Sequence, residues 1–142
     1  MKLVAVVLAA GPGTRMKSRS PKALCQLAGR PLVSYALDTM SQLTDSKPVL
    51  GIGHGSDQVR EAVGERALFV EQKKQLGTGH AVLQAQTLLQ GKCDLVLVTY
   101  VDMPLLTVET LGSLVDRQKQ NDGPLAVLSL KSDTPRGFGR IV

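Results

Sequence analysis

The feature that most constrains the fold is an uninterrupted apolar stretch near the start of the chain that runs directly into a glycine-rich loop. Residues Leu3 to Ala10 are all apolar and rich in Val, and Gly11 and Gly13 follow at once. A run of this length without polar residues is typical of a strand covered on both faces, as in parallel sheets. Glycines directly after such a strand let the backbone turn sharply and point successive N–H groups at phosphate oxygens. We therefore expect a buried strand followed by an anion-binding loop.

Helix and strand patterns alternate along the rest of the chain. Apolar residues at helical spacing predict amphipathic helices, and short apolar runs predict strands. The predicted helices are Pro31–Leu43, a short helix capped by Ser56, His80–Leu89, and a helix capped by Thr107 that continues to about Gln120; the predicted strands are Pro48–Ile52, Ala67–Val70, a second buried strand at Leu95–Tyr100, and Leu125–Leu130. This alternation predicts a Rossmann-like doubly wound α/β fold, with a mainly parallel sheet and helices on both faces. Ligands are then expected at the carboxyl ends of the strands.

Length and composition fit one domain. The 142 residues are 43% apolar, which suffices for a sizeable core. No apolar run approaches the roughly 20 residues that cross a bilayer, and no signal peptide is visible, so we expect a cytoplasmic protein without a membrane partner. Cys25 and Cys93 match no zinc or disulfide spacing and are expected to be free thiols. The final residues, Gly137 to Val142, have the pattern of a turn entering a strand, so we expect a domain truncated at its C-terminus.

The net charge of +5 is compatible with nucleic acid, with phosphorylated small molecules or with a basic surface alone. Nucleic acid is disfavoured, because two Tyr, two Phe and no Trp leave little to stack on bases. Part of the charge is local, because a group of cations lies within the first thirty residues: Arg15, Lys17, Arg19, Lys22 and Arg30. This clustering favours a phosphorylated ligand beside the glycine loop.

The glycine loop matches neither of the two common phosphate-binding motifs. A Gly-Lys-Ser/Thr sequence is missing at the Walker A distance, and Met16 stands where a dinucleotide fingerprint has its third glycine. What remains is a loop with Arg15 at its tip and Lys22 seven residues further, two cations able to neutralise a triphosphate. Spacing alone leaves a simpler alternative open, a strand-to-helix turn with surface cations.

Asp102 follows directly after a predicted strand, and Pro104 stiffens the next turn. A carboxylate in this place is typical of α/β enzymes that hold Mg²⁺ together with the phosphates of a nucleotide. One aspartate alone also suits an ordinary turn, and the metal interpretation depends on the phosphate loop on a neighbouring strand. His54 and His80 have no metal partner at ligand spacing and are expected to be structural.

These segments resemble a known signature. The stretch from Leu8 to Met16 with Pro21-Lys22 is similar to that of nucleotidyltransferases, which join a nucleoside triphosphate to a phosphorylated small molecule. Three further segments, Gln75–Ala81, Tyr100–Leu106 and Gly137–Val142, narrow the resemblance. Together they resemble the bifunctional bacterial N-acetylglucosamine-1-phosphate uridyltransferase and glucosamine-1-phosphate N-acetyltransferase family. The similarity spans the whole chain but only the first part of that family's uridyltransferase domain.

The resemblance implies a reaction and its partners. Members of this family transfer UMP from UTP to N-acetylglucosamine 1-phosphate with Mg²⁺, which yields UDP-N-acetylglucosamine and pyrophosphate. The product is a precursor of peptidoglycan and lipopolysaccharide. The family forms homotrimers through an acetyltransferase β-helix, and that domain is absent from residues 1–142.

The resemblance also implies roles for individual positions. Arg15 and Lys22 are expected on the phosphates as catalytic charge stabilisers, Asp102 on Mg²⁺, and the backbone of Gly139 on the N-acetylglucosamine moiety. Within the nucleotide site, uracil and ribose are expected at Gln72, Gly77 and Thr78. The positions expected to contact the nucleotide as a whole are Leu8, Ala9, Ala10, Gly11, Gly13, Gln72, Gly77, Thr78, Tyr100 and Val101.

The sequence departs from the family pattern in two ways. Val101 stands where the family usually has Gly, and a β-branched residue there is expected to crowd a nucleotide or to exclude a positive φ. The family's second metal ligand and two further sugar contacts lie beyond Val142. Two alternatives therefore stay open: another nucleotidyltransferase of the superfamily, cytidylyl or guanylyl, and a nucleotide-binding module without turnover.

Overall fold

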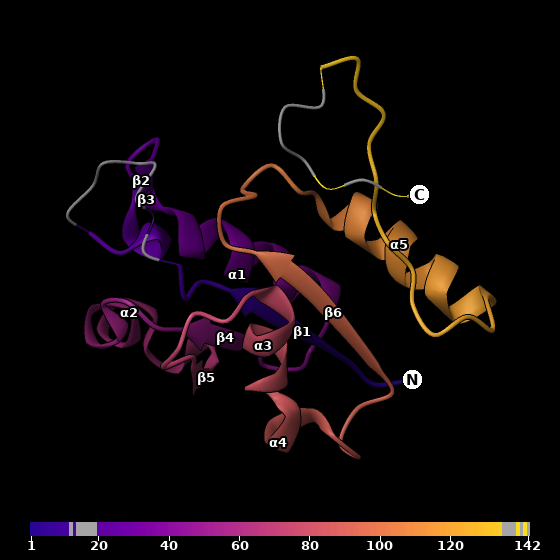
Figure 1. The fold of residues 1–142 in the computed structure, drawn as a ribbon, viewed down its shortest axis with the longest axis horizontal. Helices are drawn as coiled ribbons and strands as arrows, with labels where there is room; N and C mark the ends of the chain where they lie inside the picture. The colour runs from indigo at the N-terminus through magenta and orange to yellow at the C-terminus, as the bar shows by residue number, and fades with distance from the viewer. Residues whose placement is uncertain (12, 14–19, 135–138, 140, 142) are drawn as a thin grey trace.

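The computed structural model describes residues 1–11, 13, 20–134, 139 and 141. Within these residues four strands form one sheet in the order β5-β4-β1-β6, and every pair in it is parallel (Figure 1). The strands are β1 (Leu3–Leu8), β4 (Val49–Ile52), β5 (Leu68–Glu71) and β6 (Leu95–Tyr100). The predicted parallel α/β sheet is therefore confirmed.

Helices cover both faces of this sheet (Figure 1). Alternate residues of β1 point to opposite faces, so Val4 and Val6 pack in one hydrophobic cluster and Ala5 and Val7 in the other. The cluster around Ala5 and Val7 receives α1 (Leu32–Leu43), α2 (Ser56–Val63) and α5 (Val108–Gln120), and the cluster around Val4 and Val6 receives α3 (Thr78–Leu83) and α4 (Gln86–Leu89). Burial on both faces is the reason why the first strand contains no polar residue.

The short helix α2 begins at Ser56, one residue earlier than predicted, and Ser56 is not its N-cap. Gly55 caps the helix, with φ +66° and no capping hydrogen bond from a side chain. A Cβ on Gly55 would lie 2.2 Å from Pro21 Cγ, so only glycine fits this position. The cap therefore lies one residue earlier than predicted, at the glycine against which Pro21 packs.

The predicted helix His80–Leu89 is divided in two. It begins earlier, at Thr78, and it tightens at Gln84 and Ala85, where Ala85 N donates to Val82 O before α4 starts. The tight turn buries Ala85 completely against the sheet. Four short elements had no sequence signal: the hairpin of β2 (Gln26–Leu27) and β3 (Arg30–Pro31), and the 3₁₀ turns η2 (Lys22–Leu24) and η3 (Gly64–Arg66).

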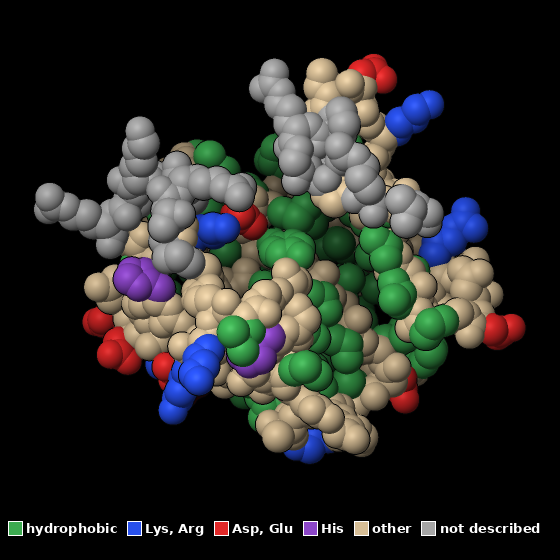
Figure 2. All heavy atoms as spheres, in the orientation of Figure 1, with side chains coloured by type: hydrophobic (Ala, Val, Ile, Leu, Met, Phe, Trp, Pro, Cys, Tyr) green, Lys and Arg blue, Asp and Glu red, His purple; other side chains and the backbone are tan. Residues whose placement is uncertain are grey.

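Two expectations about β6 and the segment Leu125–Leu130 are wrong. Leu125–Leu130 is not a strand: it pairs with no neighbour among the described residues, and most of its side chains are exposed. β6 is a strand, but it is buried on one face only, because Val96, Val98 and Tyr100 are exposed on the other. A groove of about 680 Å³ runs between β6, α5 and residues 124–128. Figure 2 shows hydrophobic side chains gathered there.

None of the helices in the described part of the chain is long and apolar enough to cross a membrane. Cys25 is buried, Cys93 is partly buried, and both are free thiols. The predicted turn and strand at 137–142 lie largely outside the described residues.

Candidate functional site

The strand order reverses between β1 and β6. From β1 the chain proceeds to β4 and β5 on one side, and it then returns to place β6 on the other side of β1. Parallel α/β sheets bind ligands outside the carboxyl ends of the strands at such a reversal. Gly11 lies just past the end of β1, and Asp102 lies just past the end of β6. The predicted loop and the predicted metal ligand therefore meet at the point where this architecture forms a crevice.

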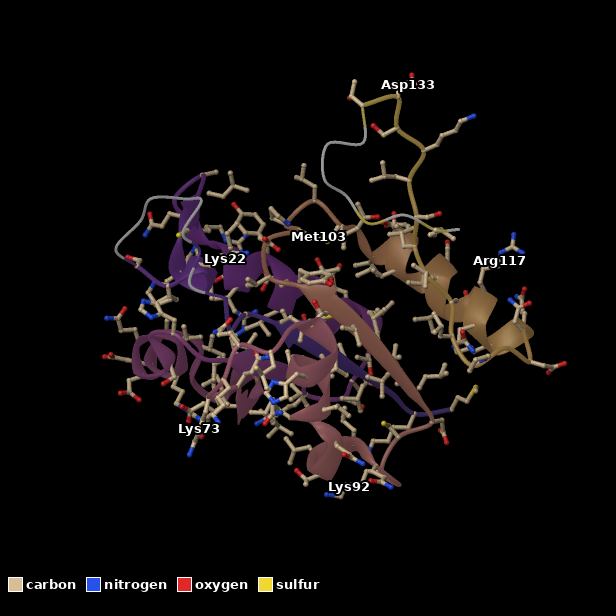
Figure 3. All side chains as sticks on the ribbon, viewed as in Figure 1. Lys22, Lys73, Lys92, Met103, Arg117 and Asp133 are labelled. Atoms are coloured by element: carbon tan, nitrogen blue, oxygen red, sulfur yellow. The ribbon has the colours of Figure 1, made fainter. Side chains whose placement is uncertain are left out.

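Lys22 bridges these two strand ends. Its Nζ donates a hydrogen bond to Asp102 Oδ2 at 2.7 Å, and the two side chains are 27% and 41% exposed. A Cβ on Gly11 would lie 3.9 Å from the same Nζ. Figure 3 shows Lys22 and Met103 at the arrowhead end of β6. The structure thus brings together three predicted positions, Gly11, Lys22 and Asp102, around one ammonium group.

The loop after β1 folds back closely on the turn that carries Lys22. Gly13 has φ +66°, and a Cβ on it would lie 3.0 Å from Lys22 Cβ and 3.3 Å from Lys22 Cα. Both the positive φ and the close approach require glycine here. Arg15, the other predicted phosphate-binding cation, lies outside the described residues.

A second part of the site comes from the loop between β5 and α3. Gln75 Nε2 donates to Ala10 O at 2.6 Å, which fastens this loop to the end of β1. Gln72 is 5% exposed, and its Nε2 donates to Gly77 O at 3.1 Å and contacts His80 Nδ1 at 3.0 Å. Gly77 has φ +101° and no described atom within 4 Å of its Cβ position, so open space lies beside its backbone. Gln72, Gly77 and Thr78 are therefore held at the same edge of the sheet as Gly11.

The remaining predicted positions differ in what they can offer a ligand. Leu8, Ala9 and Ala10 are buried, so they can reach a ligand mainly through their backbone groups. Tyr100 exposes its side chain on the groove side of β6. Gly139 is exposed, with no described atom within 4 Å of its Cβ position, so no contact brings it to the site.

Val101 was expected to crowd the nucleotide, but its side chain does not point into the crevice. Its side chain is completely buried in the cluster that contains Leu111 and Val115, and its backbone N donates to Leu8 O. Among the described non-glycine residues only Ala28 has a positive φ, so Val101 has an ordinary backbone conformation. The residue as a whole is 0% exposed, so neither its side chain nor its backbone is open to the crevice.

Two residues make contacts at the site that the sequence did not predict. His80, expected to be merely structural, contacts the buried Gln72 amide, and Gln75 ties two loops together. Neither contact had a signal in the local sequence, because both depend on the path of the loop between β5 and α3. Among the described residues no group of three or more His, Cys, Asp or Glu side chains could hold a metal by itself.

A parallel sheet with a glycine loop, a lysine and an aspartate at the strand reversal is the arrangement of a nucleotidyltransferase, an α/β enzyme that holds a nucleoside triphosphate. Residues 5–136 match the family described as the MobA-like NTP transferase domain, and the chain belongs to this family. By family it is therefore an enzyme of the nucleotidyltransferase class.

The chain is 44% identical over 141 residues to the bifunctional protein GlmU of Heliobacterium modesticaldum. The match covers 99% of this chain and 31% of that protein, so the chain spans about a third of the length of this relative. It confirms the resemblance to the uridyltransferase region of the bifunctional enzymes that the sequence motifs indicated.

Solved structures support the fold. A nucleotidyl transferase from Methanothermobacter superposes with a TM-score of 0.70 at 22% identity, over 81% of this chain and 57% of that one. The manganese complex of Rv0371C from Mycobacterium tuberculosis superposes with a TM-score of 0.70 at 21% identity, over 84% and 61%.

Proposed function

We propose that this chain provides the nucleotide site of a uridyltransferase, which transfers UMP from UTP to N-acetylglucosamine 1-phosphate and yields UDP-N-acetylglucosamine and pyrophosphate. The observation that carries the proposal is the Lys22–Asp102 pair beside Gly11, at the reversal of the strand order. The 44% identity to a bifunctional GlmU protein supports the choice of uridine and of the sugar phosphate.

The proposed reaction needs charge stabilisation more than proton transfer. A phosphate monoester has its second pKa near about 6, so the attacking oxygen of the sugar phosphate is already largely ionised at neutral pH. The protein therefore has to hold two anions together and to stabilise the charge that develops on pyrophosphate. We assign this work to the Lys22 ammonium, to Arg15 and to the backbone N–H groups around Gly11.

The donor set at the crevice fits a divalent cation that is shared with the nucleotide. Asp102 offers one exposed carboxylate, and Mg²⁺ commonly binds through one or two carboxylates while phosphates and waters complete its shell. Asp102 would hold the ion, and the ion would supply positive charge to neutralise the phosphates. The solved structure of Rv0371C, a protein with the same fold, is a complex with manganese, and this supports the proposal of a divalent metal.

The base and the ribose are proposed to lie against the loop between β5 and α3. Gln72, Gly77 and Thr78 are held at the same strand ends as Gly11, and the space beside Gly77 is open. Tyr100 would border the nucleotide from β6, with the buried Val101 behind it, and Gly139 would contact the sugar.

A two-part assay tests this proposal. The whole chain is titrated with UTP and Mg²⁺, and pyrophosphate release is then followed with UTP and N-acetylglucosamine 1-phosphate. Release that requires both substrates supports the uridyltransferase. Release with CTP or GTP in preference to UTP would overturn the assignment of the nucleotide.

The second candidate function is a nucleotide-binding module without turnover. It is favoured by the Lys22–Asp102 ion pair, in which the ammonium group occupies the carboxylate that is proposed to hold the metal. The same assay separates the two candidates, since UTP binding without pyrophosphate release would leave only the module.

A further inference from the structure

We propose that His80 is a positioning residue for base selectivity: it holds the amide of Gln72 so that the oxygen of this side chain, and not its nitrogen, faces the base. This inference rests on the proposed function, because it takes Gln72 to be the residue that meets the base.

The orientation of the Gln72 amide follows from its two partners. Gly77 O, at 3.1 Å, can only accept a hydrogen bond, so the atom that faces it has to be the amide nitrogen. The second hydrogen of that nitrogen points to His80 Nδ1 at 3.0 Å. Both hydrogens of the amide are thereby engaged, and the side chain is 5% exposed, so it has little freedom to turn over.

The amide oxygen remains available to a ligand. No hydrogen bond to Gln72 Oε1 occurs among the described residues. The one buried side-chain oxygen or nitrogen without a partner in the described part of the chain is Gln118 Oε1, so Gln72 Oε1 keeps contact with solvent. It lies in the loop that Gln75 fastens to the end of β1. Gln72 therefore presents an acceptor, not a donor, at this edge of the sheet.

This arrangement requires one tautomer of His80. A neutral imidazole accepts at one ring nitrogen only, and Gln72 needs that acceptor to be Nδ1. On the other side of the ring, Gln84 Nε2 lies 3.2 Å from His80 Nε2 and donates to His80 O at 3.0 Å. Gln84 is only partly buried, so the second hydrogen of its amide can bond to water, whereas the amide of Gln72 is buried and needs Nδ1 as its second acceptor. The contact with Gln72 therefore decides which nitrogen of His80 carries the proton.

An acceptor at this position discriminates between pyrimidines. Uracil carries a donor at N3, which an amide oxygen can accept, whereas N3 of cytosine is itself an acceptor. A site that leaves a buried polar group unpaired binds the wrong base about 10- to 100-fold more weakly. Without His80, only the bond to Gly77 O holds the amide, so Gln72 turns over more easily and can offer its nitrogen to cytosine.

Nucleotide titrations of three variants test the role of His80. The whole chain is titrated with UTP and with CTP, and the ratio of the two Kd values is compared. We expect wild type to prefer UTP by about tenfold or more, and His80→Leu to lose most of that preference. His80→Asn is expected to keep it, because the Asn oxygen can accept from Gln72 in place of Nδ1. Gln84→Leu, on the other side of the ring, is the matched control and is also expected to keep it.

A measurement without nucleotide separates this inference from the proposed function. Long-range ¹H–¹⁵N spectra of the ligand-free chain report which nitrogen of His80 is protonated, and we expect an unprotonated Nδ1. A proton on Nδ1, or an unchanged Kd ratio in folded His80→Leu, overturns the inference alone. If wild type binds neither nucleotide, the proposed function fails and the inference falls with it.

Discussion

At the scale of single residues, Lys22 and Asp102 neutralise each other in the ligand-free chain. Each is also the proposed partner of a ligand group, the ammonium for phosphate and the carboxylate for a metal ion. The pair is partly exposed, so it is worth less than about 1 kcal/mol in itself. Its function is therefore expected to show in ligand binding more than in stability.

Lys22→Met separates the two ligands. We predict that UTP binding weakens about 10- to 100-fold, because a charge-assisted hydrogen bond to phosphate is lost. Binding of Mn²⁺ alone should instead tighten a few-fold, since the cation beside Asp102 is removed. Calorimetric titrations with Mn²⁺ and with UTP measure both effects, with Lys92→Met as the control on the other side of the sheet. If the affinities for UTP and for Mn²⁺ changed in the same direction, this would contradict the proposal that Lys22 binds phosphate and also lies beside the metal ligand Asp102.

The variant Val101→Gly restores the family's usual glycine. It tests whether the valine at this position affects ligand binding or the stability of the core. The side chain of Val101 is fully buried, so Val101→Gly should destabilise the fold by about 2–4 kcal/mol through lost burial and added backbone freedom. UTP affinity of the folded protein should not increase. Urea unfolding and UTP titration check the two statements, and tighter UTP binding by the glycine variant would show that Val101 does crowd the nucleotide.

At the scale of elements, α5 begins at a cap that the sequence predicted correctly. Thr107 is extended, and its side chain accepts a hydrogen bond from Thr110 N at 3.2 Å. We predict that Thr107→Val destabilises the fold by about 1 kcal/mol, whereas Thr110→Val, which keeps the backbone donor, costs clearly less. Urea unfolding of both variants measures the difference. The hydroxyls of Thr107 and Thr110 also bond to each other at 3.2 Å. Equal losses of stability would mean that this bond, and not the cap, stabilises the helix.

A second link between elements depends on pH. Asp38 on α1 bonds to Arg30 of β3 and to Arg66 of η3. Partial burial raises the pKa of the Asp38 carboxyl, but the hydrogen bonds and charges of the two arginines outweigh it, so its pKa lies below 3.8. A carboxyl group whose pKa is lowered by folding stabilises the fold at pH values above its unfolded-state pKa. This stabilisation is lost as the pH falls through its folded-state pKa.

We therefore predict that Asp38→Asn costs less than about 1 kcal/mol at neutral pH, because the pair is largely exposed. The cost should shrink towards zero as the pH falls through the lowered folded-state pKa of Asp38. Urea unfolding of wild type and variant at neutral pH and at a series of acid pH values tests this. A cost that stays constant with pH would exclude the ion pairs as its source.

The elements also show how far sequence reasoning reaches. β1 was predicted correctly because its lack of polar residues requires cover on both faces. The same pattern in β6 predicted too much burial, since apolar composition reports what a strand can bury and not whether a neighbour is present to bury it. Leu125–Leu130 has the composition of a strand as well, but strand formation needs a partner edge, and none is formed among the described residues.

At the scale of the whole molecule, the alternation of strands and helices was sufficient to place the site. It implied a parallel sheet, and a parallel sheet brings Gly11 and Asp102 to one edge although they are far apart in the sequence. The bond between Lys22 and Asp102 was not predicted, because the sequence assigned the two side chains to phosphate and to metal and not to each other. The contacts of Gln72 with Gly77 and His80 were not predicted either, because they depend on the path of one loop that no periodic pattern encodes.

The central claim is that a nucleoside triphosphate binds where the strand order reverses, and chemical-shift mapping tests it most directly. The ¹⁵N-labelled chain is titrated with UTP and Mg²⁺ while all backbone amides are observed. We predict the largest shifts at Gly11, Gly77 and Asp102. Shifts centred on Val96 and Leu111, in the apolar groove between β6 and α5, or the absence of any saturable shift, would contradict the account.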